Sequence, residues 1–182
     1  MKNKMKNYLK LSILVLCTII STSYQGISEE FIFEGEEIEI LNEGKKLVSK
    51  KGVKITADDK TEIIADEFEY DKVKNQLLLK GNILIENSID KTLIKSNEIR
   101  YFKTLGKIIT YGDTQINIDN NYIIDTKNAV ILKKEGTLSS SENTTIKDKY
   151  QNNFKTDEFM FFVEDETLKA KNVELVDNQG NI

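Results

Sequence analysis

The sequence predicts an all-β protein built from antiparallel hairpins that stack into two facing sheets. A short pattern recurs at steps of 30, 31, 30 and 30 residues, apolar residues alternate with polar ones around its copies, and the chain contains no proline. Proline removes a hydrogen-bond donor, so its absence is compatible with long sheet ladders. The five copies are Glu36-Glu37-Ile38, Asp66-Glu67-Phe68, Asn97-Glu98-Ile99, Lys127-Asn128-Ala129 and Asp157-Glu158-Phe159.

The first 25 residues are interpreted as a secretory signal peptide and are left out of the fold. Four lysines precede the apolar stretch from Leu11 to Ile20, and Ser21-Thr22-Ser23 follows it. About ten apolar residues fall short of the roughly 20 that a membrane-spanning helix needs, so an uncleaved anchor is the weaker alternative. We therefore expect an exported protein with one β-domain over residues 30–182.

Each repeat is expected to contain a strand, a turn and a second strand. Residues typical of turns occur at the same position in every unit: Asn42-Glu43-Gly44, then residues 71–75, 103–106 and 133–136, and finally Glu164-Asp165-Glu166. A second recurring position follows the turn in each unit. In the first, second, third and fifth units it is occupied by Gly52-Val53, Gly81-Asn82, Gly112-Asp113 and Asn172-Val173, and the fourth unit has Ser139-Ser140-Ser141 instead. Glycine inside a strand indicates a bulge or bend, where the chain can turn toward the facing sheet.

The alternation assigns some residues to the inward face of the strands. In the second unit Phe68 and Tyr70 share a face, while Glu67 and Glu69 point the other way. Applied to every unit, it predicts these inward residues: Phe68, Tyr70, Ile99, Tyr101, Ile131, Phe159 and Phe161. They are candidates for the wall of an apolar groove or for a closed core, and spacing does not distinguish the two.

The composition argues against several kinds of chemistry. The chain has no histidine, and its only cysteine, Cys17, lies in the apolar stretch near the start. After removal of residues 1–25, neither imidazole nor thiol would remain for a zinc site, a disulfide or the usual nucleophilic triads. Four lysines would also be lost, which leaves 22 basic and 30 acidic residues and a charge of about −8. We expect no catalytic residue, metal or cofactor, and no nucleic-acid partner.

Pairs of carboxylates recur along the chain, at Asp58-Asp59, Asp66-Glu67 and Asp157-Glu158. A calcium site or an acid/base pair would need carboxylates that converge on one point. A repeat instead stacks them in register along a sheet edge. We therefore interpret these pairs as a solvated rim, with calcium along the ladder as the alternative.

The repeat resembles the OstA-like repeat, which is shared by the periplasmic lipopolysaccharide-transport protein LptA and by the amino-terminal domain of the outer-membrane protein LptD. The residues that carry the likeness are Ile64 to Asp71, the turn at Lys72 to Asn75, Leu77 to Lys80 and Gly81 to Glu86. The likeness recurs from Ser96 to Asp113 and around Thr156 to Phe161, and it covers essentially residues 30–182.

The resemblance implies a twisted, open β-jellyroll whose interior groove receives the acyl chains of lipid A. It also implies that such domains join edge to edge into a bridge across the periplasm, with lipopolysaccharide and other jellyroll transport proteins as partners. Independently of the family, unpaired terminal strands are templates for strand addition. The expected function is therefore a non-enzymatic, periplasmic lipopolysaccharide-transport module.

Within this family the start of the first unit, Phe31-Ile32-Phe33-Glu34, favours the amino-terminal domain of an LptD-like protein, tethered to the outer membrane if a barrel follows. The last residues, Asp177 to Ile182, resemble a turn that enters a further strand, which suggests a fragment. One alternative is an LptA-like bridge protein. Another is a structural or adhesive β-solenoid at the cell surface that binds no lipid.

Overall fold

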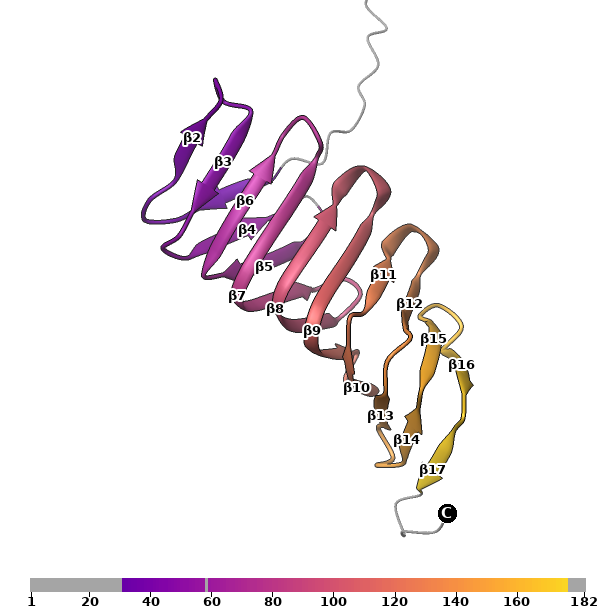
Figure 1. Ribbon diagram of the computed structural model, residues 1–182. Coiled ribbons are helices and arrows are strands. Elements are labelled where there is room, and N and C mark those ends of the chain that lie inside the picture. The colour runs from indigo at the N-terminus through magenta and orange to yellow at the C-terminus, as the bar shows by residue number, and fades with distance from the viewer. Residues whose placement is uncertain (1–30, 58, 177–182) are drawn as a thin grey trace, which may run out of the picture.

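The structure, a computed structural model, describes residues 31–57 and 59–176, which form one antiparallel sheet folded into two facing layers (Figure 1). Three long strands run through both layers: β7 (Gln76–Asn87), β8 (Thr92–Phe102) and β9 (Lys107–Ile118). The predicted signal peptide and the last six residues lie outside the described part of the chain.

The remaining strands belong to one layer each. Layer A contains β2 (Glu39–Leu41), β3 (Lys46–Ser49), β6 (Glu67–Asp71), β11 (Val130–Leu132), β12 (Thr137–Ser140), β15 (Glu158–Phe162) and β16 (Thr167–Lys171). Layer B contains β1 (Ile32–Glu34), β4 (Val53–Thr56), β5 (Thr61–Ala65), β10 (Tyr122–Lys127), β13 (Thr144–Asp148), β14 (Asn153–Thr156) and β17 (Glu174–Val176).

Within the described residues the only helices are two short 3-10 turns in layer A, η1 (Lys103–Leu105) and η2 (Lys133–Glu135). All strand pairings are antiparallel. The prediction of an all-β jellyroll of stacked antiparallel hairpins in two facing sheets is confirmed.

Each repeat supplies two hairpins, one to each layer, and not the single hairpin that the sequence predicted. In β7, residues 76–80 pair with β6 in layer A, while residues 84–87 pair with β5 in layer B. Strands β8 and β9 cross between the layers in the same way and pair with each other in both. The sequence analysis missed the second hairpin because a single unbroken strand such as β7 belongs to both hairpins, and the turns of the second hairpin, such as residues 88–91, fall outside the phase of the predicted turn signals.

The bends stack on one another and form a seam along one side of the molecule. In β7 the register shifts between Lys80 and Ile83, around Gly81 and Asn82, which both have a positive φ. Neighbouring bends are joined by backbone hydrogen bonds, because the N–H of Asp66 donates to the carbonyl of Gly81 at 3.0 Å. The bend predicted from the glycine inside the strand is therefore confirmed.

Buried hydroxyl groups satisfy the backbone where the seam interrupts the ladders. The Thr110 hydroxyl oxygen accepts hydrogen bonds from the N–H of Ala129 at 2.9 Å and from the hydroxyl of Thr114 at 2.8 Å. The hydroxyls of Thr126 and Thr144 lie 2.7 Å apart. No buried side-chain nitrogen or oxygen of the described residues lacks a partner, so the seam avoids the cost of about 1–3 kcal/mol for each unsatisfied buried group.

Replacing Gly81 with alanine should destabilise the protein more than the same change at Gly112. Their φ angles are 72° and 77°, so alanine costs roughly 1 kcal/mol at either position. At Gly81 the added Cβ would also lie 3.0 Å from the Cβ of Asp66, whereas at Gly112 nothing lies within 4 Å. In urea denaturation we expect Gly81→Ala to lower the free energy of unfolding by about 2–3 kcal/mol and Gly112→Ala by about 1 kcal/mol. Equal losses would contradict this account.

Candidate functional site

The side of the molecule opposite the seam is an open edge between two rows of turns. The turns of layer A are joined to one another, as in the 2.9 Å hydrogen bond from the N–H of Lys133 to the carbonyl of Gly106. The turns of layer B are joined likewise, as from Asp119 to Lys91 at 2.9 Å. Among the described residues no backbone hydrogen bond connects one row with the other, so the layers are hinged at the seam alone.

A cavity of about 310 Å³ lies between the layers and opens at this edge. Its wall is aliphatic and comes from both layers: Ile85, Ile94, Ile116 and Ile118 from layer B, and Ile108, Ile131, Leu138 and Val163 from layer A. Polar side chains from the turns surround its mouth, among them Asp90, Lys133 and Glu164. An apolar interior with a few polar groups at the entrance is typical of a binding site for an apolar or amphipathic ligand.

Aromatic rings close the interior on the amino-terminal side of the cavity. The ring of Phe31 lies 5.6 Å from that of Tyr70 and 5.9 Å from that of Tyr101, in edge-to-face contacts. Phe33 stacks on Phe68 at 5.1 Å. Such rings fill the space between facing sheets, which lie about 10 Å apart, whereas the isoleucines of the middle strands are too short to do so. The cavity therefore begins where the aromatic residues end.

Side-chain interactions cross the open edge on each side of the cavity. On the amino-terminal side Lys133 of η2 forms an ion pair with Asp59, from the turn before β5. On the carboxyl-terminal side the hydroxyl of Tyr122 donates to a carboxylate oxygen of Glu166 at 3.5 Å, and the Tyr122 ring lies 5.1 Å from the ring of Phe161. The mouth of the cavity is thus bounded by side-chain contacts.

Partial burial by itself raises the pKa of the Asp59 carboxyl group, but hydrogen bonds from Lys133 and Thr61 together outweigh it. The pKa of Asp59 therefore lies below its ordinary value, and the carboxylate is charged at neutral pH. At the other end of the mouth, burial raises the pKa of Tyr122, and the negative charge of Glu166 adds to this, so Tyr122 stays neutral.

The seven residues predicted to face inward all lie between the layers, but only Ile131 lines the cavity. Phe68, Tyr70 and Tyr101 lie on the aromatic amino-terminal side. Ile99, Phe159 and Phe161 are fully buried in the core. Whether any of the seven contacts a ligand is taken up below as a proposal.

Sequence reasoning missed most of the cavity wall. Ile85, Ile108 and their neighbours occur in apolar runs such as Ile83-Leu84-Ile85 and Ile108-Ile109, which do not show which residue faces inward. The strand pairing in the structure shows which residue faces inward. Ile108 lies opposite Tyr101 and Ile131, both of which face the interior. Pairing residues across the turn at 103–106, which sets Tyr101 opposite Ile108, would have identified Ile108.

The predicted carboxylate rim is wrong for Asp59. Asp66 and Asp157 do lie at the seam, where the side-chain amides of Asn82 and Asn172 donate to them at 2.8 Å each. Asp59 lies at the opposite, open edge, because the pair Asp58-Asp59 occurs at a different phase of the repeat, and Asp58 itself is outside the described residues. Over residues 31–57 and 59–176, no group of three or more acidic, histidine or cysteine side chains is placed to hold a metal.

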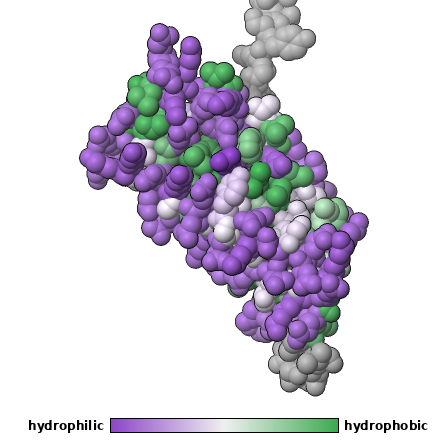
Figure 2. All heavy atoms as spheres, in the orientation of Figure 1, coloured by the Kyte–Doolittle hydropathy of each residue, from purple (hydrophilic) through white to green (hydrophobic). Residues whose placement is uncertain are grey.

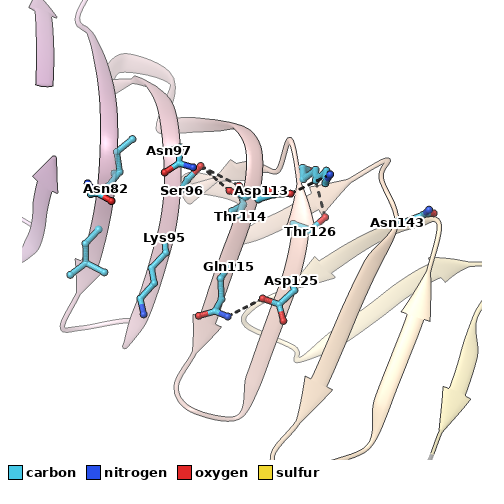
Figure 3. A pocket seen from close by; sticks show the side chains of 13 residues that line it. Asn82, Lys95, Ser96, Asn97, Asp113, Thr114, Gln115, Asp125, Thr126 and Asn143 are labelled. Atoms are coloured by element: carbon cyan, nitrogen blue, oxygen red, sulfur yellow. Dashed lines mark hydrogen bonds and ion pairs between the residues drawn. The ribbon is translucent and has the colours of Figure 1, made fainter. Parts of the chain in front are cut away.

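Larger hollows occur on the outer surfaces, and most of the residues that line them are polar or charged. One of about 690 Å³ lies outside layer B, where Gln115 of β9 and Asp125 of β10 point toward each other and are joined by a 2.9 Å hydrogen bond (Figure 3). Another, of about 540 Å³, lies outside layer A and is lined mainly by lysine and glutamate. The face in Figure 2 is mainly hydrophilic, with apolar side chains in separate small groups. The cavity between the layers is therefore the better candidate site for an apolar ligand.

No family model and no curated protein matches this sequence. A solved structure with a similar fold is that of LptH from Pseudomonas aeruginosa, described as the LptA homologous periplasmic component of the conserved lipopolysaccharide transport device. The two chains are 12% identical, the TM-score is 0.47, and the match covers 81% of this chain and 94% of that one. At this identity and score, the similarity assigns neither a ligand nor a function to this chain.

Replacing Asp59 with asparagine should destabilise the protein at pH 7 but not in strong acid. The pKa of Asp59 is lowered by folding from an unfolded value near 3.9, so its stabilisation is present above about pH 4 and is lost as the pH falls through the folded pKa. Because the ion pair is partly exposed, we expect the free energy of unfolding to fall by roughly 0.5–1 kcal/mol at pH 7. This difference from the wild-type protein should disappear between about pH 4 and pH 2.

Thermal unfolding of both proteins across this range measures the effect. Asp90→Asn, the same chemical change on the neighbouring turn of layer B, is the control, because Asp90 forms no ion pair within the described residues. A loss for Asp59→Asn that persists unchanged at pH 2 would mean that the charge of Asp59 is not the stabilising factor.

Proposed function

We propose that this protein is a periplasmic lipid-transport module, of the lipopolysaccharide-transport kind, that holds acyl chains between its two layers. The observation that carries the proposal is the aliphatic cavity of about 310 Å³, which opens along an edge where no backbone hydrogen bond of the described residues joins the two layers. Moving an acyl chain from water into such a cavity is favourable by about 25 cal/mol for each Å² of apolar surface buried. The sequence resemblance to the OstA-like repeat supports the same function.

The size of the cavity suggests how a large lipid would be accommodated. Ligand pockets usually measure about 300–1,000 Å³, so this cavity stands at the low end of the range. It suits part of one acyl chain. A lipid with several chains would need the layers to separate further at the open edge, with the seam as the hinge.

We propose distinct roles for the seven predicted residues. Ile131 contacts the acyl chain directly, since it lines the cavity. The other six form the floor and ends of the groove, and they contact the lipid only when the mouth widens. These six are Phe68, Tyr70, Ile99, Tyr101, Phe159 and Phe161.

We also propose that copies of the fold join edge to edge. In the described chain, β1 pairs only with β4, and β2 only with β3, while β16 and β17 end the layers at the other side. Inward-facing apolar residues are left exposed at both ends: Ile40 is 68% exposed and Leu175 is 45% exposed. A neighbouring domain that added its strands there would pair the free edges and cover these side chains.

The finer assignment that we favour is the amino-terminal domain of an LptD-like protein, exported by its signal peptide and tethered to the outer membrane. An LptA-like bridge protein is the alternative. Sequencing the reading frame downstream of Ile182 distinguishes them, since a long series of amphipathic barrel strands would indicate LptD. Of the described residues, no helix reaches the length and apolarity needed to cross a bilayer.

A surface solenoid without lipid binding is the second candidate function, and the aromatic closure of the amino-terminal half favours it. A larger side chain inside the cavity distinguishes the solenoid from the lipid-transport function. Ile131→Phe should reduce the affinity for a fluorescent acyl probe by about tenfold, because the ring occupies the space of the chain. Ile123→Phe, on the outward face of β10, is the matched control and should leave the affinity unchanged.

Fluorescence titration measures the affinity, and photo-crosslinking from position 131 to lipopolysaccharide in cells gives a second measurement. If the wild-type protein, correctly folded, binds no acyl probe and labels no lipid, the transport function is wrong and the solenoid is favoured.

A charge at the carboxyl-terminal edge should prevent assembly. In Leu175→Asp a carboxylate would be placed where we propose that the neighbouring domain packs, and burying it would cost several kcal/mol. We expect crosslinked oligomers of the wild-type protein to be lost in this variant. Ile123→Asp, which adds the same charge away from the edges, should keep them, and equal loss in both variants would argue against edge-to-edge association.

A further inference from the structure

Lys133 is the one basic side chain among the described residues that line the cavity. Its ammonium group extends from layer A to the Asp59 carboxylate of layer B and lies 3.4 Å from the hydroxyl oxygen of Thr61. The Lys133 side chain is only 24% exposed, the lowest value for a lysine in any ion pair of the described chain. A cation held beside an apolar wall is costly unless an anion accompanies it.

Two further lysines lie beside Lys133 on the same row of turns. The Lys103 ammonium nitrogen lies 4.4 Å from the centre of the Phe31 ring, and that of Lys134 donates to the backbone carbonyl of Thr104 at 2.9 Å. Neither lysine forms an ion pair within residues 31–57 and 59–176. Lys133 therefore lies among lysines that have no acidic partner within the described residues, at a mouth that also carries Asp59, Asp90, Glu135 and Glu164.

The Asp59 carboxylate can be exchanged for another anion without damage to the sheets. The pair crosses the open edge, where no backbone hydrogen bond of the described residues joins the layers. Separating it therefore breaks side-chain interactions alone. An amphiphile whose chain entered the cavity would have its head group at the mouth, within reach of the same ammonium group.

We propose that Lys133 is the anion-anchoring residue of the cavity: its ammonium group releases Asp59 and binds the phosphate of an amphiphile whose acyl chain lies between the layers. This inference rests on the lipid-binding function proposed above and adds the charge of the head group to it. Asp59 takes the place of the phosphate in the empty protein. The Thr61 hydroxyl, which lies beside the ammonium group, donates a hydrogen bond to the same phosphate.

The test compares two amphiphiles with the same chain, dodecyl phosphate and dodecyl maltoside, below their critical micelle concentrations and by isothermal titration calorimetry. Lys133→Gln should weaken dodecyl phosphate binding roughly three- to tenfold and leave dodecyl maltoside binding unchanged. Asp59→Asn should strengthen dodecyl phosphate binding, because the competing carboxylate is gone. Lys133→Arg should preserve the preference for phosphate. Inorganic phosphate alone should not displace dodecyl phosphate, because it gains nothing from the cavity.

Lys134→Gln is the matched control, since it removes the same charge from the same turn but at a side chain that does not line the cavity. If Lys133→Gln weakens both amphiphiles equally, the pair merely holds the layers together and the inference is wrong. It is also wrong if Lys134→Gln has the same effect as Lys133→Gln. If the wild-type protein binds neither amphiphile, the lipid-binding function itself fails. Thermal unfolding of each variant establishes that it is folded.

Discussion

The whole structure depends on how the backbone is satisfied at the seam. Each time the chain passes from one layer to the other, the ladder of hydrogen bonds shifts, and residues with positive φ such as Gly81 and Asn82 absorb the bend. Bonds between neighbouring bends and buried hydroxyls such as Thr110 replace the interrupted ladder. Because these interactions recur along the seam, the two layers are hinged there, and in the part of the chain that the structure describes no backbone hydrogen bond joins them at the other side.

The side chains between the two layers decide which part of the space between them is filled. On the amino-terminal side the rings of Phe31, Tyr70 and Tyr101 meet in edge-to-face contacts. In the middle strands the inward positions hold isoleucine, which is shorter, and a cavity opens between Ile94 and Ile131 and their neighbours. A change of residue type at equivalent positions of a repeat therefore leaves a cavity in place of a closed core without any change of fold.

Among the described residues, only side-chain interactions connect the two layers across the mouth of the cavity. An ion pair such as Lys133–Asp59, partly exposed, contributes little to stability, whereas the ladders of the two layers contribute much more. The mouth can therefore widen at small cost while both layers and the seam persist.

The sequence by itself determined the all-β class, the repeat, the bend at Gly81 and the inward direction of residues such as Phe68 and Phe159, since these follow from local periodicity and turn chemistry. Only the tertiary structure decided that each repeat spans both layers and that Ile131 lines a cavity while Phe159 is buried in the core. It also brought together Asp59 and Lys133, which are 74 residues apart. The reason is that a strand pattern gives the face of a residue but not its neighbour in the opposite layer, which depends on how several repeats stack.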